Sequence, residues 1–211
     1  MTVSAGRRWR GTESDERVEA RRVRLVEAAL ELLGGGGSGA VSVRAVCRQA
    51  GLTERYFYES FADRAALLVA VLDAVAGAAH DVIVAALAEG GADVAAWIER
   101  IVSSFTAFLD ADPRRTAMLF VESMATPELL ARSGELLEQF TALIAAGVAA
   151  GGFAPGDRLD GELNARAIFG ALARVYADRA SGAVEVDSSR VNAHVAAVVL
   201  ALAGISSRPV G

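Results

Sequence analysis

Residues 42–67 read SVRAVCRQAGLTERYFYESFADRAAL, and this stretch decides the fold. Its first part has apolar side chains at intervals of three and four residues, the spacing of one helix face. Gly51 can adopt the left-handed conformation that ends a helix, and Thr53 is a good N-cap for the next one. The pattern predicts two short helices joined by a tight turn, a helix-turn-helix whose second helix enters the DNA major groove. The apolar positions of the first helix are Val43, Val46, Cys47 and Ala50.

The second helix of this motif carries the side chains that we expect to contact DNA. Arg55 is the first candidate for base reading, because arginine pairing with guanine is the commonest specific contact. Tyr56 suits either a thymine methyl group or a phosphate. Glu54 either accepts a hydrogen bond from cytosine or pairs with Arg55 or Arg44. Arg44, on the preceding helix, is a further candidate for a base or a phosphate contact.

The composition favours an all-α protein with a locally basic N-terminal part. Hydrophobic residues make up 53% of the 211 residues, there are only four prolines, and strand-like alternation is scarce. All 21 basic residues are arginine, and the net charge is −5. Residues 1–67, however, hold 11 arginines against 9 acidic residues, a local charge of +2. Because phosphate contacts depend on local charge, DNA binding is compatible with a protein whose overall charge is negative.

Several function classes are not supported by the sequence. Cys47 is the only cysteine, which excludes an intramolecular disulfide and a cysteine-based zinc site; we expect it to be a small buried hydrophobe. His80 and His194 lie far apart, and no nucleophile is spaced with a base, so we expect no metal, no cofactor and no enzymatic activity. We also expect no membrane span and no signal peptide, and therefore a cytoplasmic protein.

Along the chain we expect a short N-terminal arm and two helical domains. Residues 1–16 are expected to be a disordered arm, whose Arg7–Arg10 cluster either enters a minor groove or is a solvated tail. A first helix is predicted from about 16 to 33, ended by the glycine run that follows. The DNA-binding domain is placed at 17–67 and a second domain at 68–211.

Capping residues predict the helices of the second domain. Asp63 is a plausible N-cap for a long helix that runs towards Leu87. Asp112-Pro113 and Thr126-Pro127 each place a capping side chain before a proline that suits the first helical position. The further helices are expected at residues 94–110, 114–124, 128–150, 162–180 and 189–203.

The residues after the turn resemble the tetracycline-repressor (TetR) family of transcriptional regulators. Ala50-Gly51-Leu52-Thr53 is followed by Tyr58, Phe61, Arg64 and Leu67 at three-residue spacing, and the likeness covers residues 20–70. It implies a three-helix DNA-binding domain and a larger helical domain for ligand binding and dimerisation.

The same resemblance implies roles for individual residues. Ser42 and Thr53 lie at helix N-termini, where hydroxyl and backbone N–H groups can bind phosphate. Tyr58 would give its hydroxyl to a backbone phosphate. Arg64 stands where the family usually has lysine; it keeps the charge, adds a bidentate option and is expected to contact DNA as well. Phe57 is assigned to the core, together with Phe61 and Leu67.

The apolar second half is implied to enclose a small-molecule pocket. Aromatic and methionine side chains would form its walls, with a few polar groups to orient a ligand. For each single residue, an ordinary core position is the alternative. The candidate ligand-binding residues are Trp97, Phe105, Phe108, Met118, Glu122, Met124, Phe140 and Tyr176.

The last two helices are implied to form a homodimer interface, a four-helix bundle built from two subunits. Two recognition helices related by a two-fold axis would read a palindromic operator. The candidate interface residues are Ile168, Leu172, Val175, Val191, His194, Val195, Val198 and Leu202.

The sequence therefore predicts a dimeric transcriptional repressor that binds double-stranded DNA and is released by a small, largely apolar effector. The alternative is a helical DNA-binding regulator that is controlled by a protein partner or that acts as an activator.

Overall fold

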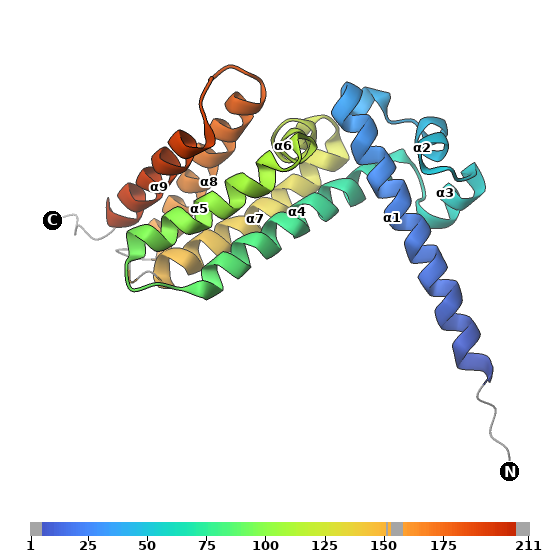
Figure 1. The fold of residues 1–211 in the computed structure, drawn as a ribbon, viewed down its shortest axis with the longest axis horizontal. Coiled ribbons are helices and arrows are strands. Elements are labelled where there is room, and N and C mark those ends of the chain that lie inside the picture. The colour runs from blue at the N-terminus through green and yellow to red at the C-terminus, as the bar shows by residue number, and fades with distance from the viewer. Residues whose placement is uncertain (1–5, 151, 153–157, 206–211) are drawn as a thin grey trace, which may run out of the picture. The chain divides into compact units, whose positions relative to one another are not determined.

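The computed structural model describes residues 6–150, 152 and 158–205, and every regular element in these ranges is a helix (Figure 1). The predicted all-α fold, with a helix-turn-helix near the N-terminus and a larger helical part behind it, is confirmed. The chain divides into two compact units, Met1–Ala74 and Val75–Gly211. Their boundary falls within one helix, seven residues after the predicted start of the second domain at 68.

The first unit contains α1 (Gly6–Ala40), α2 (Val43–Ala50), α3 (Glu54–Ser60) and the beginning of α4 (Arg64–Glu89). α1 contacts both short helices, and these contact each other. Its core is a continuous set of apolar side chains that are less than a tenth exposed, among them Leu25, Ala29, Leu30, Leu33, Val46, Phe57, Phe61 and Leu67.

Helix α1 is longer at both ends than the sequence predicts. It begins at Gly6, so the expectation of a disordered arm is wrong from that residue on. Arginine and glutamate are good helix formers, and extending an existing helix avoids the cost of a new nucleus. The side chains of Arg7–Arg10 lie outside the described residues, as do residues 1–5. In the glycine run the helical conformation fails at Gly36 and Gly37, later than the predicted end near 33.

The capping chemistry follows the prediction at Gly51 and Asp63, whereas Thr53, the predicted N-cap of α3, makes no side-chain cap hydrogen bond. Ser42 accepts a hydrogen bond from the backbone N–H of Ala45 at 3.2 Å, and so caps α2. Gly51 has φ 62° and ends α2 in the left-handed conformation. Asp63 accepts from the backbone N–H of Ala66 at 2.8 Å at the start of α4. Local side-chain chemistry therefore sets where α2 and α4 begin.

The second unit contains the rest of α4 together with α5 (Val94–Asp110), α6 (Pro113–Phe120), a 3-10 turn η1 (Glu122–Met124), α7 (Pro127–Ala150), α8 (Arg158–Ala180) and α9 (Ser188–Ile205). α5 packs on α9, and α7 packs on α8. The single helix predicted for 114–124 is instead interrupted at Val121. The hydroxyl of Ser123 donates to the carbonyl of Leu119 at 2.8 Å, a side-chain bond of the kind that bends helices.

Helix α4 bears on the expectation that the protein has no membrane span. By length and composition alone, this helix is long and apolar enough to cross a membrane. In its most apolar stretch, 44% of the residues are buried inside the protein. Leu67, Leu72 and Val75 are among these buried residues. A core helix passes the same compositional test, so length and composition alone do not make α4 a membrane span.

Gly51→Ala is predicted to lower the free energy of unfolding by about 1–2 kcal/mol, because an L-residue in the left-handed region is strained. Gly77→Ala is the matched control: Gly77 lies inside α4, and an added Cβ there meets nothing within 4 Å. This control should raise stability by about 0.5–1 kcal/mol. Urea unfolding of both variants measures the two effects, and an unchanged Gly51→Ala variant would contradict the role of the turn.

Candidate nucleic-acid interface and apolar cavity

Helix α3 is held to its unit by one aromatic side chain. Phe57 is fully buried, and its ring makes an edge contact with Tyr58 at 5.3 Å and a tilted contact with Phe61 at 5.9 Å between centroids. Arg55, Tyr56 and Tyr58 are exposed, Tyr58 by 58%. The helix thus buries one face and presents to solvent the side chains that were predicted to meet DNA.

Two of these exposed side chains are held in a common network. Arg55 donates from Nε to Glu59 Oε1 at 3.0 Å, one turn further along α3. The other oxygen of Glu59 lies 3.8 Å from Arg21 Nη2 of α1. The guanidinium of Arg21 in turn stacks over the ring of Tyr56, 4.5 Å from its centroid. Glu59 and Arg21 therefore orient both candidates for base reading, a role that the sequence did not reveal.

Glu54 pairs with Arg44 in the structure. Arg44 Nε lies 3.4 Å from Glu54 Oε1, and the Arg44 side chain is 89% exposed. Such an exposed pair contributes little to stability, so a phosphate can replace the carboxylate at small cost. The hydroxyl of Ser42 is engaged in its helix cap, whereas Thr53 makes no side-chain cap hydrogen bond.

Arg64 makes contacts inside its own unit that the sequence did not predict. Its guanidinium donates to the backbone carbonyls of Val41 and Ser38, in the segment just before α2. In the structure Arg64 therefore forms a tie between the start of α4 and this segment, and its assignment to DNA contact stays a prediction. Arginine provides two parallel donors for such a tie, which the lysine usual in the resembled family does not.

Two further arginines of α1 hold the ends of the short helices. Arg22 Nη1 donates to the carbonyl of Ser60, the last residue of α3, at 3.1 Å. Arg24 Nη2 donates to the carbonyl of Ala50, the last residue of α2. A cation suits a helix C-terminus, where carbonyls lack partners and the helix dipole is negative. Their partners lie far away in sequence, so the arginine count alone could not separate these ties from DNA contacts.

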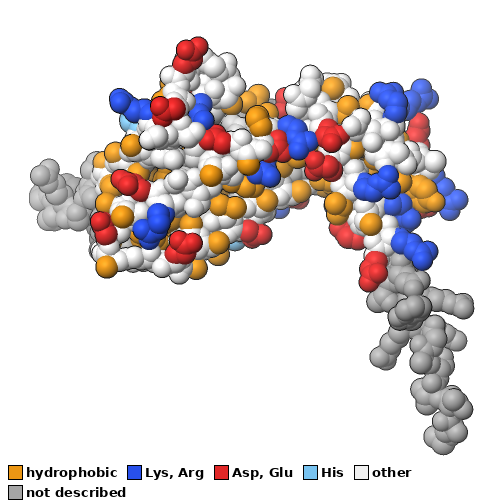
Figure 2. Space-filling model, in the orientation of Figure 1, with side chains coloured by type: hydrophobic (Ala, Val, Ile, Leu, Met, Phe, Trp, Pro, Cys, Tyr) orange, Lys and Arg blue, Asp and Glu red, His pale blue; other side chains and the backbone are white. Residues whose placement is uncertain are grey.

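Arginine side chains gather on the surface around α2 and α3 (Figure 2). Cys47 does not contribute to this surface, because it is 5% exposed. Burial, and to a smaller extent the nearby charge of Glu54, raises the pKa of its thiol above the ordinary value. The cysteine is a core residue of the first unit, as the sequence predicts.

The second unit contains a partly open cavity of about 120 Å³ whose wall is almost wholly apolar. Parts of α4, α5, α6, α7, α8 and α9 contribute to it. The lining residues are Ile83, Leu87, Trp97, Ile98, Ile101, Val102, Phe105, Phe120, Phe140, Leu143, Ile144, Gly147, Val148, Ile168, Phe169, Leu172, Ala173, Tyr176 and Val199.

Half of the predicted ligand-binding residues line this cavity, namely Trp97, Phe105, Phe140 and Tyr176. Phe108 does not: it stacks on Phe105 and lies under the guanidinium of Arg115.

Three other predicted ligand-binding residues, Met118, Glu122 and Met124, also lie outside the cavity wall. Met118 is fully buried in the core, whereas Met124 is 70% exposed. The interruption at Val121 separates Met118, on α6, from Glu122 and Met124, on η1.

The sequence did not single out the aliphatic part of the wall. Ile83 and Leu87 of α4 are four residues apart, as are Leu143 and Gly147 of α7 and Ile144 and Val148 of the same helix. This four-residue spacing is the feature of the sequence that could have pointed to these residues, but an ordinary core helix has the same spacing.

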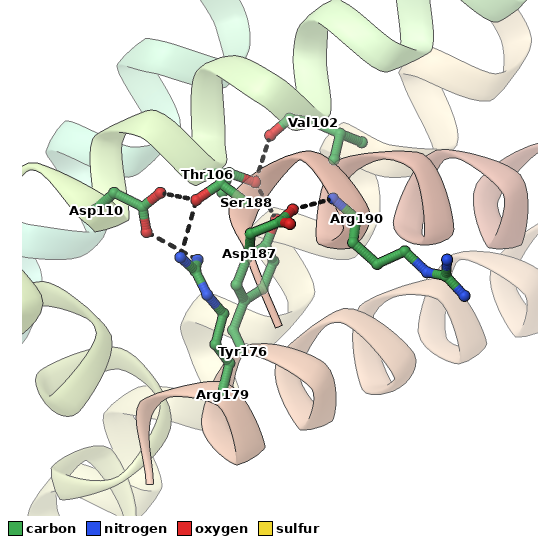
Figure 3. A network of polar contacts seen from close by, with 8 residues as sticks. All are labelled: Val102, Thr106, Asp110, Tyr176, Arg179, Asp187, Ser188 and Arg190. Carbon is green, nitrogen blue, oxygen red and sulfur yellow. Dashed lines mark hydrogen bonds and ion pairs between the residues drawn. The ribbon is translucent and has the colours of Figure 1, made fainter. Parts of the chain in front are cut away.

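A polar network links α5, α8 and α9 beside the cavity (Figure 3). Tyr176 and Thr106 are joined by a buried hydrogen bond of 2.7 Å. Nearby, Arg179 donates to Asp110 at 2.8 Å and to the hydroxyl of Ser188 at 2.9 Å, and Ser188 also donates to Asp110. Burial raises the pKa of the Tyr176 phenol, so the neutral form persists at physiological pH.

The predicted dimer residues divide into three groups by burial. Ile168, Val191 and Val195 are almost fully buried inside their own unit, so their assignment to a surface between subunits is wrong. The inward stripe of an amphipathic helix has the same sequence pattern as an interface stripe, and this explains the error. Leu172 and Val175 are partly buried against the same core, and Leu172 also lines the cavity. His194 is exposed, and Val198 and Leu202 are partly exposed.

Comparison with known proteins confirms the family resemblance at the helix-turn-helix. Residues 25–71 match the family model described as bacterial regulatory proteins, tetR family. Comparison with curated proteins gives no significant match. Residues 72–211 are therefore compared through structure alone.

Solved structures of transcriptional regulators share the fold. The regulator FadR of Bacillus subtilis, solved in complex with stearoyl-CoA, is 18% identical with a TM-score of 0.73, over 86% of this chain and 98% of that chain. The fatty acid degradation regulator FadR of Bacillus halodurans is 21% identical with a TM-score of 0.71, over 85% and 94%. A putative TetR-family regulator of Mesorhizobium loti is 17% identical with a TM-score of 0.70, over 90% and 98%.

Arg64→Ala is predicted to destabilise the first unit by about 1–3 kcal/mol, because two part-buried carbonyls lose a charged donor. Arg48→Ala, an exposed arginine of α2, is the matched control and should change stability by less than about 0.5 kcal/mol. Thermal unfolding without DNA measures both. Unchanged stability of Arg64→Ala, together with weaker DNA binding, would favour the assignment to a phosphate contact over this tie.

Proposed function

We propose that this protein is a ligand-responsive transcriptional repressor of the cytoplasm that binds a palindromic operator as a homodimer. The observation that carries the proposal is the recognition helix α3, anchored by the buried Phe57, with Arg55, Tyr56 and Tyr58 facing solvent. An anchored helix with an arginine and hydroxyl groups on its outer face suits major-groove reading combined with phosphate contact.

A dimer can read a longer stretch of DNA than one short helix can. α3 has seven residues, and two copies related by a two-fold axis would read two half-sites about one helical turn apart or somewhat more. On α8, Leu159 and Leu163 are 60% and 55% exposed in the single chain. We assign them, together with the exposed His194 and the partly exposed Leu202 of α9, to the face that meets the partner subunit.

The cavity is the proposed effector site. Its wall suits a small, largely apolar ligand, because no charged side chain lines it. A structural neighbour, FadR of Bacillus subtilis, was solved with stearoyl-CoA, a ligand with a long hydrocarbon chain. That neighbour supports an apolar effector here.

Helix α4 is the proposed route of the signal. It carries Arg64, which ties the segment before α2, and further along it carries Ile83 and Leu87 of the cavity wall. An effector that prefers one position of this helix would lower DNA affinity by the difference in its affinity for the two states.

The experiment that tests the proposal is a gel shift with the DNA that flanks the protein's own gene, with and without cell extract. A shift at low salt that disappears with a small-molecule fraction supports the repressor. Absence of any shift at low salt would reject DNA binding. A shift that responds only to a protein fraction would favour control by a protein partner.

Arg55→Ala is predicted to weaken operator binding by about 1–3 kcal/mol and to relax specificity at one base position, since a bidentate base contact is lost. Binding to the operator and to its single-base variants, measured by fluorescence anisotropy, tests this. An equal loss on every sequence would instead make Arg55 a phosphate contact. Arg190→Ala, an exposed arginine of α9, is the control and should bind as the wild type does.

Tyr58→Phe is predicted to weaken binding to all DNA sequences alike, because only a hydroxyl group on a phosphate is removed and the ring contact with Phe57 remains. The dependence of affinity on salt should stay the same, since no charge is lost. An affinity equal to that of the wild type would remove Tyr58 from the set of DNA contacts.

A further inference from the structure

Only two of the side chains that line the cavity carry a hydrogen-bonding group. They are Trp97 and Tyr176; every other lining side chain is hydrocarbon, and Gly147 has none. What the cavity offers a ligand therefore depends on whether these two groups are free.

The indole of Trp97 is not free to bind a ligand. Its Nε1 donates to the backbone carbonyl of Ala86 at 3.2 Å in the buried interior. An indole has a single donor and no acceptor, so its capacity is exhausted.

The direction of the bond between Tyr176 and Thr106 follows from a count of hydrogens. A threonine hydroxyl has one hydrogen, and that of Thr106 is donated to the carbonyl of Val102 at 2.9 Å. In the 2.7 Å contact, therefore, the hydroxyl of Tyr176 donates and Thr106 accepts (Figure 3). The phenolic oxygen keeps a lone pair but has no hydrogen left for a ligand.

The backbone around the cavity adds no donor either. Every lining residue lies within a helix, where each N–H is donated to the preceding turn. Trp97 is nearest to a helix start, and its N–H bonds to the carbonyl of Asp93 at 3.0 Å. The wall thus has no free donor and no charge, and its side chains offer one acceptor.

We propose that the cavity selects an uncharged ligand with a hydrocarbon body whose polar group, where it has one, is a hydrogen-bond donor such as an alcohol hydroxyl. This assignment rests on the proposed effector site and names its ligand class. The Tyr176 oxygen accepts from the alcohol. A carboxylate, an ester or an ether oxygen in the same place meets no donor and loses its hydrogen bonds to water.

The size of the cavity sets the scale of the probe. A dry apolar cavity of about 150 Å³ holds benzene, so the 120 Å³ here suits a chain or ring of roughly six carbons. Hexan-1-ol and 1-methoxypentane are isomers of this size, and only the alcohol has a donor. Hexanoate, also with six carbons, has a carboxylate and so tests a charged acceptor without a donor.

The test is a binding titration of the full chain with these three probes, read by thermal stabilisation and by calorimetry. Hexan-1-ol should bind more tightly than 1-methoxypentane by about 5- to 150-fold, the usual effect of one unsatisfied buried polar group. Hexanoate should bind least. Equal or tighter binding of the ether or of hexanoate, or no binding by any of the three, would overturn the assignment.

Two variants test the source of the preference. Tyr176→Phe removes the acceptor, so the alcohol should lose its advantage while the ether binds as before. Thr106→Val removes the acceptor of the Tyr176 hydrogen, so that this hydrogen becomes available and the ether should gain. A preference that stays unchanged in both folded variants would contradict the assignment, and the three-probe comparison on the wild type decides the question if neither variant folds.

The ligand class and the repressor function can fail separately. Alcohol binding is measured without DNA, and operator release is measured by adding hexan-1-ol to the gel shift. Selective binding without release would reject the effector role and keep the ligand class. Release caused by an acid or an ether in preference to the alcohol would reject the ligand class and keep the effector role of the cavity.

Discussion

A helix of seven residues is too short to be stable in water on its own, and the DNA-reading end of this protein depends on what holds α3 in place. The fully buried ring of Phe57 holds its middle, and Arg22 holds its last carbonyl. In the same way, Arg24 donates to the last carbonyl of α2, and Arg64 donates to two carbonyls in the segment that precedes α2. Arginines in the first unit therefore act as internal ties, and only part of its positive charge remains for phosphate.

This division explains what the sequence could predict. Gly51 and Asp63 act on residues close to them in the chain and have the predicted roles, whereas Ser42, predicted as a phosphate contact, caps α2. Arg64 meets carbonyls more than twenty residues away, and local pattern cannot choose between such partners and DNA. The same limit applies to Ile168. An apolar stripe on a helix has the same sequence pattern whether it packs inside its own chain or against a second copy.

The cavity shows how few polar atoms are needed to give an apolar space its chemical preference. Aromatic residues of the second half were predictable as its wall, and four of the five that were named do line it. The polarity of the site depends on which groups are hydrogen-bonded to each other. Thr106 donates its hydroxyl hydrogen to the carbonyl of Val102, so the hydroxyl of Tyr176 must be the donor in its bond to Thr106. The sequence contains both residues, but only the three-dimensional arrangement shows which atom gives and which receives.

The single cysteine of the chain has a practical consequence. Cys47 is buried in the core of the first unit, on the helix that precedes the turn, and burial raises the pKa of its thiol. A thiol reagent can reach it only when that unit opens, so the labelling rate reports the local opening free energy of the DNA-reading end. No engineered probe is needed for such a measurement, and it follows the first unit even while the larger helical unit stays folded.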